Sequence, residues 1–140
     1  MKYASLRNDP EARVLPMPTA TFIYDGDCAF CRFWVNRWRK HTKHVKYAPY
    51  QQVAEKYAAI SREEFQQAAH LIESKNGRAY RAAAAVFKLW TYRSRSGKML
   101  WFAYRYLPLF RPMAEQAYRF VARHRPFFWA VTKLFWRNAN

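Results

Sequence analysis

The residues of this sequence with the clearest chemical potential are its two cysteines, Cys28 and Cys31, which stand in Cys-x-x-Cys spacing. A thiolate attacks a disulfide, whereas a thiol does not. The unpaired N–H groups and the positive end of the dipole at the start of a helix stabilise a thiolate. Cysteines placed there predict dithiol–disulfide exchange, with Cys28 as the nucleophile nearer solvent and Cys31 as the resolving thiol one turn later.

Charged side chains flank this pair on both sides. Asp25 and Asp27 precede it and Arg32 follows it. The arginine would add positive potential near a thiolate. The two carboxylates would oppose the thiolate if they lie close, unless one of them shuttles a proton for Cys31. We therefore assign Asp25 either to such a proton shuttle or to the turn of the motif.

A zinc site is one alternative for the cysteines, because His41 and His44 complete a set of two Cys and two His. Nine residues separate Cys31 from His41 and two separate the histidines, and both gaps are shorter than in the usual zinc finger. A continuous helix over the intervening ten residues would be about 15 Å long and would hold His41 away. We expect a solvated histidine pair, with no metal and no organic cofactor. Inert helix cysteines are the other alternative.

The sequence around the cysteines predicts a strand, a turn and a helix. Residues 21–24 are β-branched and aromatic, and Asp25-Gly26 ends the run as a turn. Asp27 is the expected N-cap of a helix that begins at the first cysteine. Apolar side chains then recur at helical spacing from Phe30 to Trp38.

The following segments complete a small α/β fold. A strand–helix–strand unit implies a parallel pair with a right-handed crossover, and a hairpin adds antiparallel strands. We predict a thioredoxin-like core, a mixed sheet flanked by helices, over residues 20–95. Its later elements are a strand at 45–48 closed by Pro49, a short helix at 51–57, a capping box at 61–64, a hairpin with strands at 70–73 and 78–81, and a helix at 82–92.

The two ends of the chain lie outside this core. Residues 1–19 form an irregular lead-in, in which charges and prolines leave no apolar region of a signal peptide. Residues 96–140 form a basic, aromatic helical extension, with Pro112 in the first turn of a helix that reaches His124. No uncharged run approaches the roughly 20 apolar residues of a membrane-spanning helix. We expect a cytoplasmic protein with reactive cysteines and no permanent disulfide.

Composition excludes several classes of protein. The chain has 140 residues, 51% of them hydrophobic and 19% aromatic, which is too apolar for a disordered basic tail. Three glycines exclude a collagen-like chain, and two cysteines exclude a disulfide-stapled scaffold. The formal net charge is +16, and residues 78–140 carry +12 of it, from 13 basic side chains and Glu115. The excess charge therefore lies beyond the cysteine motif.

This basic region suggests an anionic partner. Arginines and lysines interleave with aromatic residues from Trp101 to Trp136. The pattern suits peripheral contact with an anionic membrane, or stacking on single-stranded nucleic acid. The pattern equally suits packing of the aromatic residues on the core, with the basic residues on the solvent-exposed face. Nucleic acid is the least favoured partner, because no known nucleic-acid module is recognisable.

The motif also supports a family resemblance. Residues 24–31 resemble the signature of the DCC thiol-disulfide oxidoreductase family, which is named for the spacing Asp-x-x-Cys-x-x-Cys. The likeness covers roughly residues 20–128, far more than a chance Cys-x-x-Cys would. Its further parts are Asn76–Tyr80 with Ala85-Val86, which resemble the family's hairpin and next helix, and Leu107-Pro108 with Tyr118–Arg125, which resemble its C-terminal block.

The resemblance implies a thioredoxin-like fold and dithiol–disulfide exchange with a thiol or disulfide substrate, either a protein or a small molecule. Classical thioredoxins place a cis-proline before the strand that faces the cysteines, whereas Gln67-Ala68-Ala69 stands there in this sequence. The predicted function is a thiol-disulfide oxidoreductase. The alternatives are a non-enzymatic docking module for an anionic membrane or partner, and a zinc-binding protein.

Overall fold

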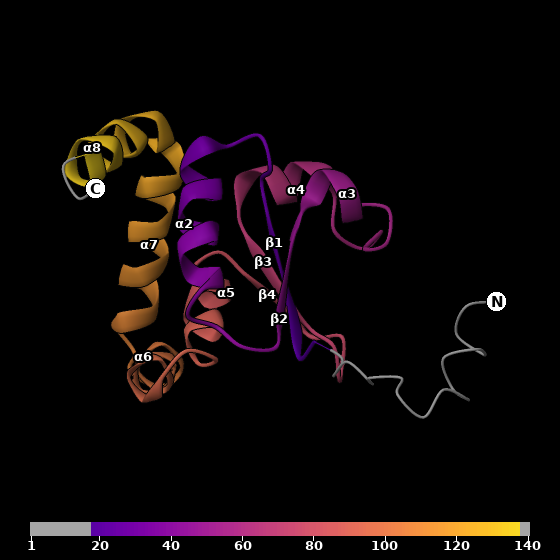
Figure 1. The fold of residues 1–140 in the computed structure, drawn as a ribbon. Coiled ribbons are helices and arrows are strands. Elements are labelled where there is room, and N and C mark those ends of the chain that lie inside the picture. The colour runs from indigo at the N-terminus through magenta and orange to yellow at the C-terminus, as the bar shows by residue number, and fades with distance from the viewer. Residues whose placement is uncertain (1–17, 138–140) are drawn as a thin grey trace, which may run out of the picture.

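The computed structural model describes residues 18–137 and contains a four-stranded mixed sheet of order β2-β1-β3-β4 (Figure 1). β1 pairs in parallel with β2 and antiparallel with β3, which pairs antiparallel with β4. The prediction of one parallel unit joined to a hairpin is therefore confirmed. The strands are β1 (Ala20–Tyr24), β2 (Val45–Pro49), β3 (His70–Glu73) and β4 (Ala79–Arg81).

Helices flank both faces of the sheet. α2 connects β1 to β2 and lies with α5 and the C-terminal helices on one side, whereas α3 and α4 cover the other side (Figure 1). This is the predicted thioredoxin-like α/β arrangement with added C-terminal helices. The helices are α2 (Ala29–Arg39), α3 (Tyr50–Val53), α4 (Arg62–Gln67), α5 (Ala83–Trp90), α6 (Arg95–Tyr106), α7 (Phe110–Arg123) and α8 (Arg125–Arg137).

The two faces of the sheet bury separate apolar clusters, because successive side chains of a strand point to opposite sides. Phe22 and Leu71 belong to the cluster on the side of α2 and α5. Ile23 and Ile72, one residue further along the same strands, pack with Phe65 of α4 on the other side. The alternation fixes the register of β1, and thereby the position of the turn that follows it.

Three local sequence signals are confirmed. Ser61 caps α4 with both hydrogen bonds of a capping box, and Gly77 adopts a positive φ of 68° in the turn of the β3–β4 hairpin. Pro112 lies in the first turn of α7, which ends at Arg123. The helix expected at 51–57 is shorter than predicted, because α3 ends at Val53 and the chain continues in turns.

The C-terminal helices return to the core. α6 crosses α5 so closely that a Cβ on Gly97 would collide with the carbonyl oxygen of Trp90. α8 lies on α2, where the ring of Phe33 is 5.9 Å from Trp129 and 5.6 Å from Trp136. In contrast, no residue of α7 is buried. No helix among residues 18–137 is long and apolar enough to cross a membrane.

Candidate functional site

The end of β1 and the start of α2 hold the cysteine pair. Cys28 is the N-cap of α2, with extended backbone angles (φ −89°, ψ 113°). Its Sγ accepts a hydrogen bond from the backbone N–H of Cys31 at 3.2 Å. The prediction that Asp27 caps this helix is therefore wrong by one residue. The sulfur of Cys28 takes the acceptor position that a Ser or Asp oxygen usually fills, so the helix begins after the cysteine.

The turn before Cys28 is organised by two polar side chains. Asp25 Oδ1 accepts hydrogen bonds from the N–H of Asp27 at 3.0 Å and from Nε2 of Gln51 at 2.9 Å. The amide of Gln51 also accepts the N–H of Gly26, at 3.0 Å, through its Oε1. Residue 51 thus ties the turn to the start of α3 and fixes the direction in which α2 leaves β1.

Close packing makes Gly26 necessary in this turn. A Cβ at that position would lie 2.7 Å from Cβ of Pro49, which ends the neighbouring parallel strand. The carbonyl oxygen of Gly26 accepts a hydrogen bond of 2.7 Å from the guanidinium of Arg32. Arg32, which the sequence suggested as a source of positive potential, therefore contacts the turn backbone.

The environment of the two thiols separates their pKa values. The hydrogen bonds from the side chain and backbone of Cys31, together with the charge of Arg125, lower the pKa of Cys28 to about 6, against the opposing effects of burial and Asp25. The pKa of Cys31 is raised, first by its hydrogen bond to Cys28 and then by its deeper burial. Near neutral pH the pair therefore holds one proton, on Cys31, and a thiolate on Cys28.

Arg125, at the start of α8, is the cation that acts on this thiolate. One guanidinium nitrogen lies 3.7 Å from Oδ2 of Asp25, and another donates a 3.5 Å hydrogen bond to the carbonyl oxygen of Gln67. The Asp25 and Arg125 side chains are both largely shielded from solvent, with 17% and 20% of their areas exposed. The first residue of α8 is thus joined to the turn that carries Cys28.

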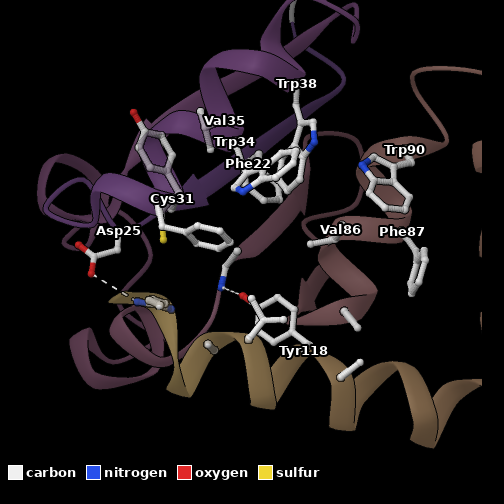
Figure 2. Close-up of a pocket in the computed structure, with 18 of the residues that line it drawn as sticks. Phe22, Asp25, Cys31, Trp34, Val35, Trp38, Val86, Phe87, Trp90 and Tyr118 are labelled. Atoms are coloured by element: carbon white, nitrogen blue, oxygen red, sulfur yellow. Dashed lines mark hydrogen bonds and ion pairs between the residues drawn. The ribbon is translucent and has the colours of Figure 1, made fainter. Parts of the chain in front are cut away.

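An apolar cavity of about 500 Å³ opens beside Cys31, between α2, α5 and α7 (Figure 2). Asp25 and Cys31 lie at one end of it, and Trp90 and Phe87 lie at the other. The apolar face of α7 forms one wall, which explains why that helix faces the core without burying a residue. The Cys31 thiol therefore lines an internal space that suits an uncharged apolar group.

The backbone before β3 is occupied by a side chain of α7. The N–H of Ala69 donates a 2.8 Å hydrogen bond to the hydroxyl of Tyr118 (Figure 2). No peptide bond among residues 18–137 is cis, so the cis-proline of classical thioredoxins has no equivalent in this part of the chain. The hydroxyl of Tyr118 instead binds the backbone at this position, where the sequence has no proline.

The histidines considered as zinc ligands lie elsewhere. His41 and His44 follow the C-terminal end of α2 and are exposed, whereas Cys28 and Cys31 lie at its start. Within residues 18–137 no group of three or more His, Cys, Asp or Glu side chains is placed to hold a metal ion. The structure therefore offers no support for the zinc alternative among these residues.

Sequence reasoning missed three residues of this site. Gln51 could have been found, because it follows the strand parallel to β1, and the carboxyl ends of neighbouring parallel strands meet at one edge of a sheet. Tyr118 and Arg125 lie about 90 residues after the cysteines, and no spacing rule connects them. Their single signal is the block at 118–125 that resembles the DCC family.

Comparison with known proteins gives one match. The family model described as DCC1-like thiol-disulfide oxidoreductase matches residues 22–130, which include both cysteines, Gln51, Tyr118 and Arg125. No curated protein and no solved structure matches the chain.

Proposed function

The chain belongs to the DCC1-like thiol-disulfide oxidoreductase family, and we propose that it catalyses dithiol–disulfide exchange. Cys28 is the nucleophile and Cys31 the resolving thiol. The observation that carries the proposal is the position of Cys28 at the N-cap of α2, where its sulfur accepts the N–H of Cys31. Donors at a helix start favour a thiolate, the form that attacks disulfides.

The exchange proceeds in two steps that conserve electrons and protons. The Cys28 thiolate attacks one sulfur of the substrate disulfide, which forms a mixed disulfide and releases one substrate thiolate. Cys31 then gives up its proton and attacks Cys28, which releases the second substrate thiolate and leaves a Cys28–Cys31 disulfide. Two electrons pass to the substrate, and water protonates the released thiolates. The reverse sequence oxidises a substrate dithiol.

Asp25 is the proposed proton acceptor for Cys31, in addition to its part in the turn. Its carboxylate lines the same cavity as Cys31. One oxygen binds the turn through Asp27 and Gln51, whereas the other faces Arg125. A carboxylate held in this way is oriented by the turn, and it can take a proton that must leave an apolar environment.

Alkylation kinetics test the proposal. The rate of iodoacetamide reaction with the reduced chain, followed from pH 4 to 10, should show a transition near pH 6 that is present in Cys31→Ser and absent in Cys28→Ser. Mild oxidation should join the two cysteines, which peptide mass spectrometry detects. A transition near pH 9 in every variant that retains a thiol, without formation of this disulfide, would falsify the exchange function.

A second candidate function, docking to an anionic membrane, is favoured by the surface of the C-terminal helices. Ten large apolar side chains there are more than half exposed, and they lie among arginines and lysines. Such surfaces bind the anionic cytoplasmic leaflet by combined apolar insertion and charge attraction. The exposed residues are Met99, Phe102, Tyr106, Leu107, Leu109, Met113, Phe120, Phe127, Leu134 and Phe135.

Vesicle sedimentation tests this candidate separately. The chain should sediment with vesicles that contain phosphatidylserine at low salt, and remain in solution with phosphatidylcholine alone. Leu109→Ser combined with Met113→Ser should weaken the binding, since both side chains are at least 70% exposed. Cys28→Ser is the matched control and should bind normally. Equal binding to both kinds of vesicle, or none to either, argues against docking.

A further inference from the structure

A second cavity, of about 530 Å³, lies beside the proposed exchange site and is lined by four arginines. We propose that these arginines select small anionic disulfides, whose carboxylates they bind while the disulfide reaches Cys28. This inference rests on the proposed exchange function and names the substrate class of the same site. The arginines are Arg81, Arg119, Arg123 and Arg125.

The cavity is formed by segments that are distant in the sequence. The end of α4 and the backbone before β3 supply one wall, and the end of β4 supplies Arg81. The last turns of α7 and the start of α8 supply the other three arginines. The fold thus gathers guanidinium groups from three elements around one hollow, an arrangement that a single basic helix face would not produce.

The protein neutralises only part of the charge in this cavity, through the contact of Arg125 with Asp25 and through Glu115. Glu115 is the one acidic residue of the lining, and its carboxylate accepts a 2.6 Å hydrogen bond from the hydroxyl of Tyr104. Arg81 donates to the amide oxygen of Gln67, which is uncharged. Within residues 18–137, neither Arg119 nor Arg123 takes part in an ion pair. At Arg119 and Arg123 an anionic ligand would therefore gain attraction without displacing an acidic partner.

Arg125 connects this cavity to the proposed exchange site. It lines both cavities, together with Tyr118 and Ala122, and its guanidinium contacts Asp25 in the turn that leads to Cys28. A ligand seated among the arginines would thus contact the same side chain, Arg125, that contacts the turn. A disulfide whose carboxylates lie a few bonds from its sulfur atoms suits this arrangement, and a cavity of this size accommodates a small peptide.

Arginine geometry suits the carboxylates of such a ligand. The planar guanidinium binds a carboxylate with two parallel hydrogen bonds, and it keeps its charge at every relevant pH. A cationic disulfide of similar reactivity would be repelled by the same four groups. The predicted reaction consumes one anionic disulfide and yields two anionic thiols and the Cys28–Cys31 disulfide, so two electrons pass from the protein to the ligand.

The test compares two aliphatic disulfides of opposite charge. Oxidised glutathione, which is net anionic, and cystamine, which is net cationic, are mixed with the reduced full-length chain. The rate of Cys28–Cys31 disulfide formation is measured by rapid alkylation and mass spectrometry. The wild-type chain should react at least about tenfold faster with the anionic disulfide, and the ratio should fall at high salt.

Charge-reversal variants test whether the arginines of this cavity cause the preference for the anionic disulfide. Arg119→Glu combined with Arg123→Glu should lower the anionic-to-cationic rate ratio by about tenfold or more. Lys75→Glu combined with Arg78→Glu is the matched control, because it changes the net charge equally. These two side chains are exposed in the β3–β4 hairpin, at the opposite end of β1 from Cys28. The control should retain most of the wild-type ratio.

The outcomes separate this inference from the exchange function. If neither disulfide oxidises the wild-type chain, the exchange function itself is wrong. If both oxidise it at the same rate, or if the control lowers the ratio as much as the test variant, selection by the arginines is wrong although exchange stands. Arg119→Gln with Arg123→Gln covers the case in which the glutamate variant fails to fold. It should lower the ratio about threefold, and an unchanged ratio contradicts the proposal.

Discussion

The turn that carries Cys28 and the helices α6 to α8 are built in opposite ways. In the turn, short polar contacts join Asp25, Gly26 and Cys28 to partners a few positions away or to Gln51, just after the adjoining strand. The segment from α6 to α8 leaves ten large apolar side chains exposed and carries half of the net positive charge. The first region fixes the position of a thiol, whereas the second leaves apolar and basic side chains open to solvent.

The two regions nevertheless meet at specific contacts. Arg125 of α8 reaches Asp25 in the turn, and Tyr118 of α7 binds the N–H of Ala69 before β3. The C-terminal helices therefore complete the thiol site and cover it. Variants that separate the regions, or that alter one contact between them, show how far the chemistry of the turn depends on the helices.

The largest effect is expected where α6 crosses α5. Gly97→Ala places a methyl group against the carbonyl oxygen of Trp90, which accepts the N–H groups of Arg93 and Ser94 and cannot move without disrupting the turn between α5 and α6. In an ordinary helix this change is stabilising by about 1 kcal/mol, whereas here it should lower the free energy of unfolding by about 3 kcal/mol. Urea denaturation followed by circular dichroism measures the loss.

Lys98→Ala is the control for this prediction, since Lys98 is the next residue of α6 and is exposed. It should change the free energy of unfolding by less than about 0.5 kcal/mol. If Gly97→Ala is as stable as the control, the two helices do not cross as closely as the structure indicates. A destabilised variant that keeps a Cys28 pKa near 6 would show that the turn does not need the helices.

Ionisation of Cys28 should make the free energy of unfolding depend on pH. The pKa is about 6 in the folded chain and 9.0 for an ordinary thiol, so the folded state binds fewer protons between these values. Stability should therefore rise from pH 6 to 9 and be lost as the pH falls through 6. The expected contribution is about 1 to 2 kcal/mol, since solvent screens a half-exposed thiol.

Urea unfolding of the reduced chain at pH 5.5 and 8.5 isolates this contribution when Cys28→Ser is measured beside the wild type. The difference between the two proteins should grow with pH, because serine does not ionise. Above pH 9 the trend reverses, since the raised pKa of Cys31 favours the unfolded state once ordinary thiols lose their protons. If the free energies of unfolding of the two proteins change equally with pH, Cys28 does not ionise at the start of α2.

The sequence predicted the features of the fold that depend on residues close together in the chain. The strand before the motif, the capping box at Ser61 and the hairpin turn at Gly77 follow from contacts within a few positions, and the structure contains all three. The N-cap was misplaced because cap rules rank Asp above Cys, and they do not anticipate that a sulfur will accept the N–H of Cys31.

The remaining features of the site depend on tertiary packing. Arg125 approaches Asp25 because α7 and α8 fold back over the core, and neither hydropathy nor spacing encodes that return. The first cavity likewise results from how α7 packs against α2 and α5, and the second from how α7 and α8 lie beside the ends of α4 and β4. The pattern of charge suggested an anionic partner for the C-terminal half, but it could not place four arginines around one cavity next to the thiol turn.

The contact between Arg125 and the turn can be tested directly. Arg125→Gln removes the cation that lowers the pKa of Cys28 and should raise this pKa by about one unit, which leaves a smaller thiolate fraction at pH 6. Alkylation rates below pH 7 should fall by up to about tenfold. Lys40→Gln, at the opposite end of α2, is the control and should leave the profile unchanged. An unshifted profile in Arg125→Gln would mean that the turn sets the pKa of Cys28 without α8.

The smallest effect is expected at the contact between Tyr118 and Ala69. Tyr118→Phe removes the hydroxyl that accepts the Ala69 N–H and leaves this donor without its 2.8 Å partner. The loss should be about 1 kcal/mol of unfolding free energy, because an unsatisfied donor costs more than a neutral hydrogen bond contributes. Tyr106→Phe, at a side chain 61% exposed on α6, should be silent in the same urea denaturation. If the two variants are equally stable, water replaces the hydroxyl at Ala69, and the backbone before β3 is open to solvent.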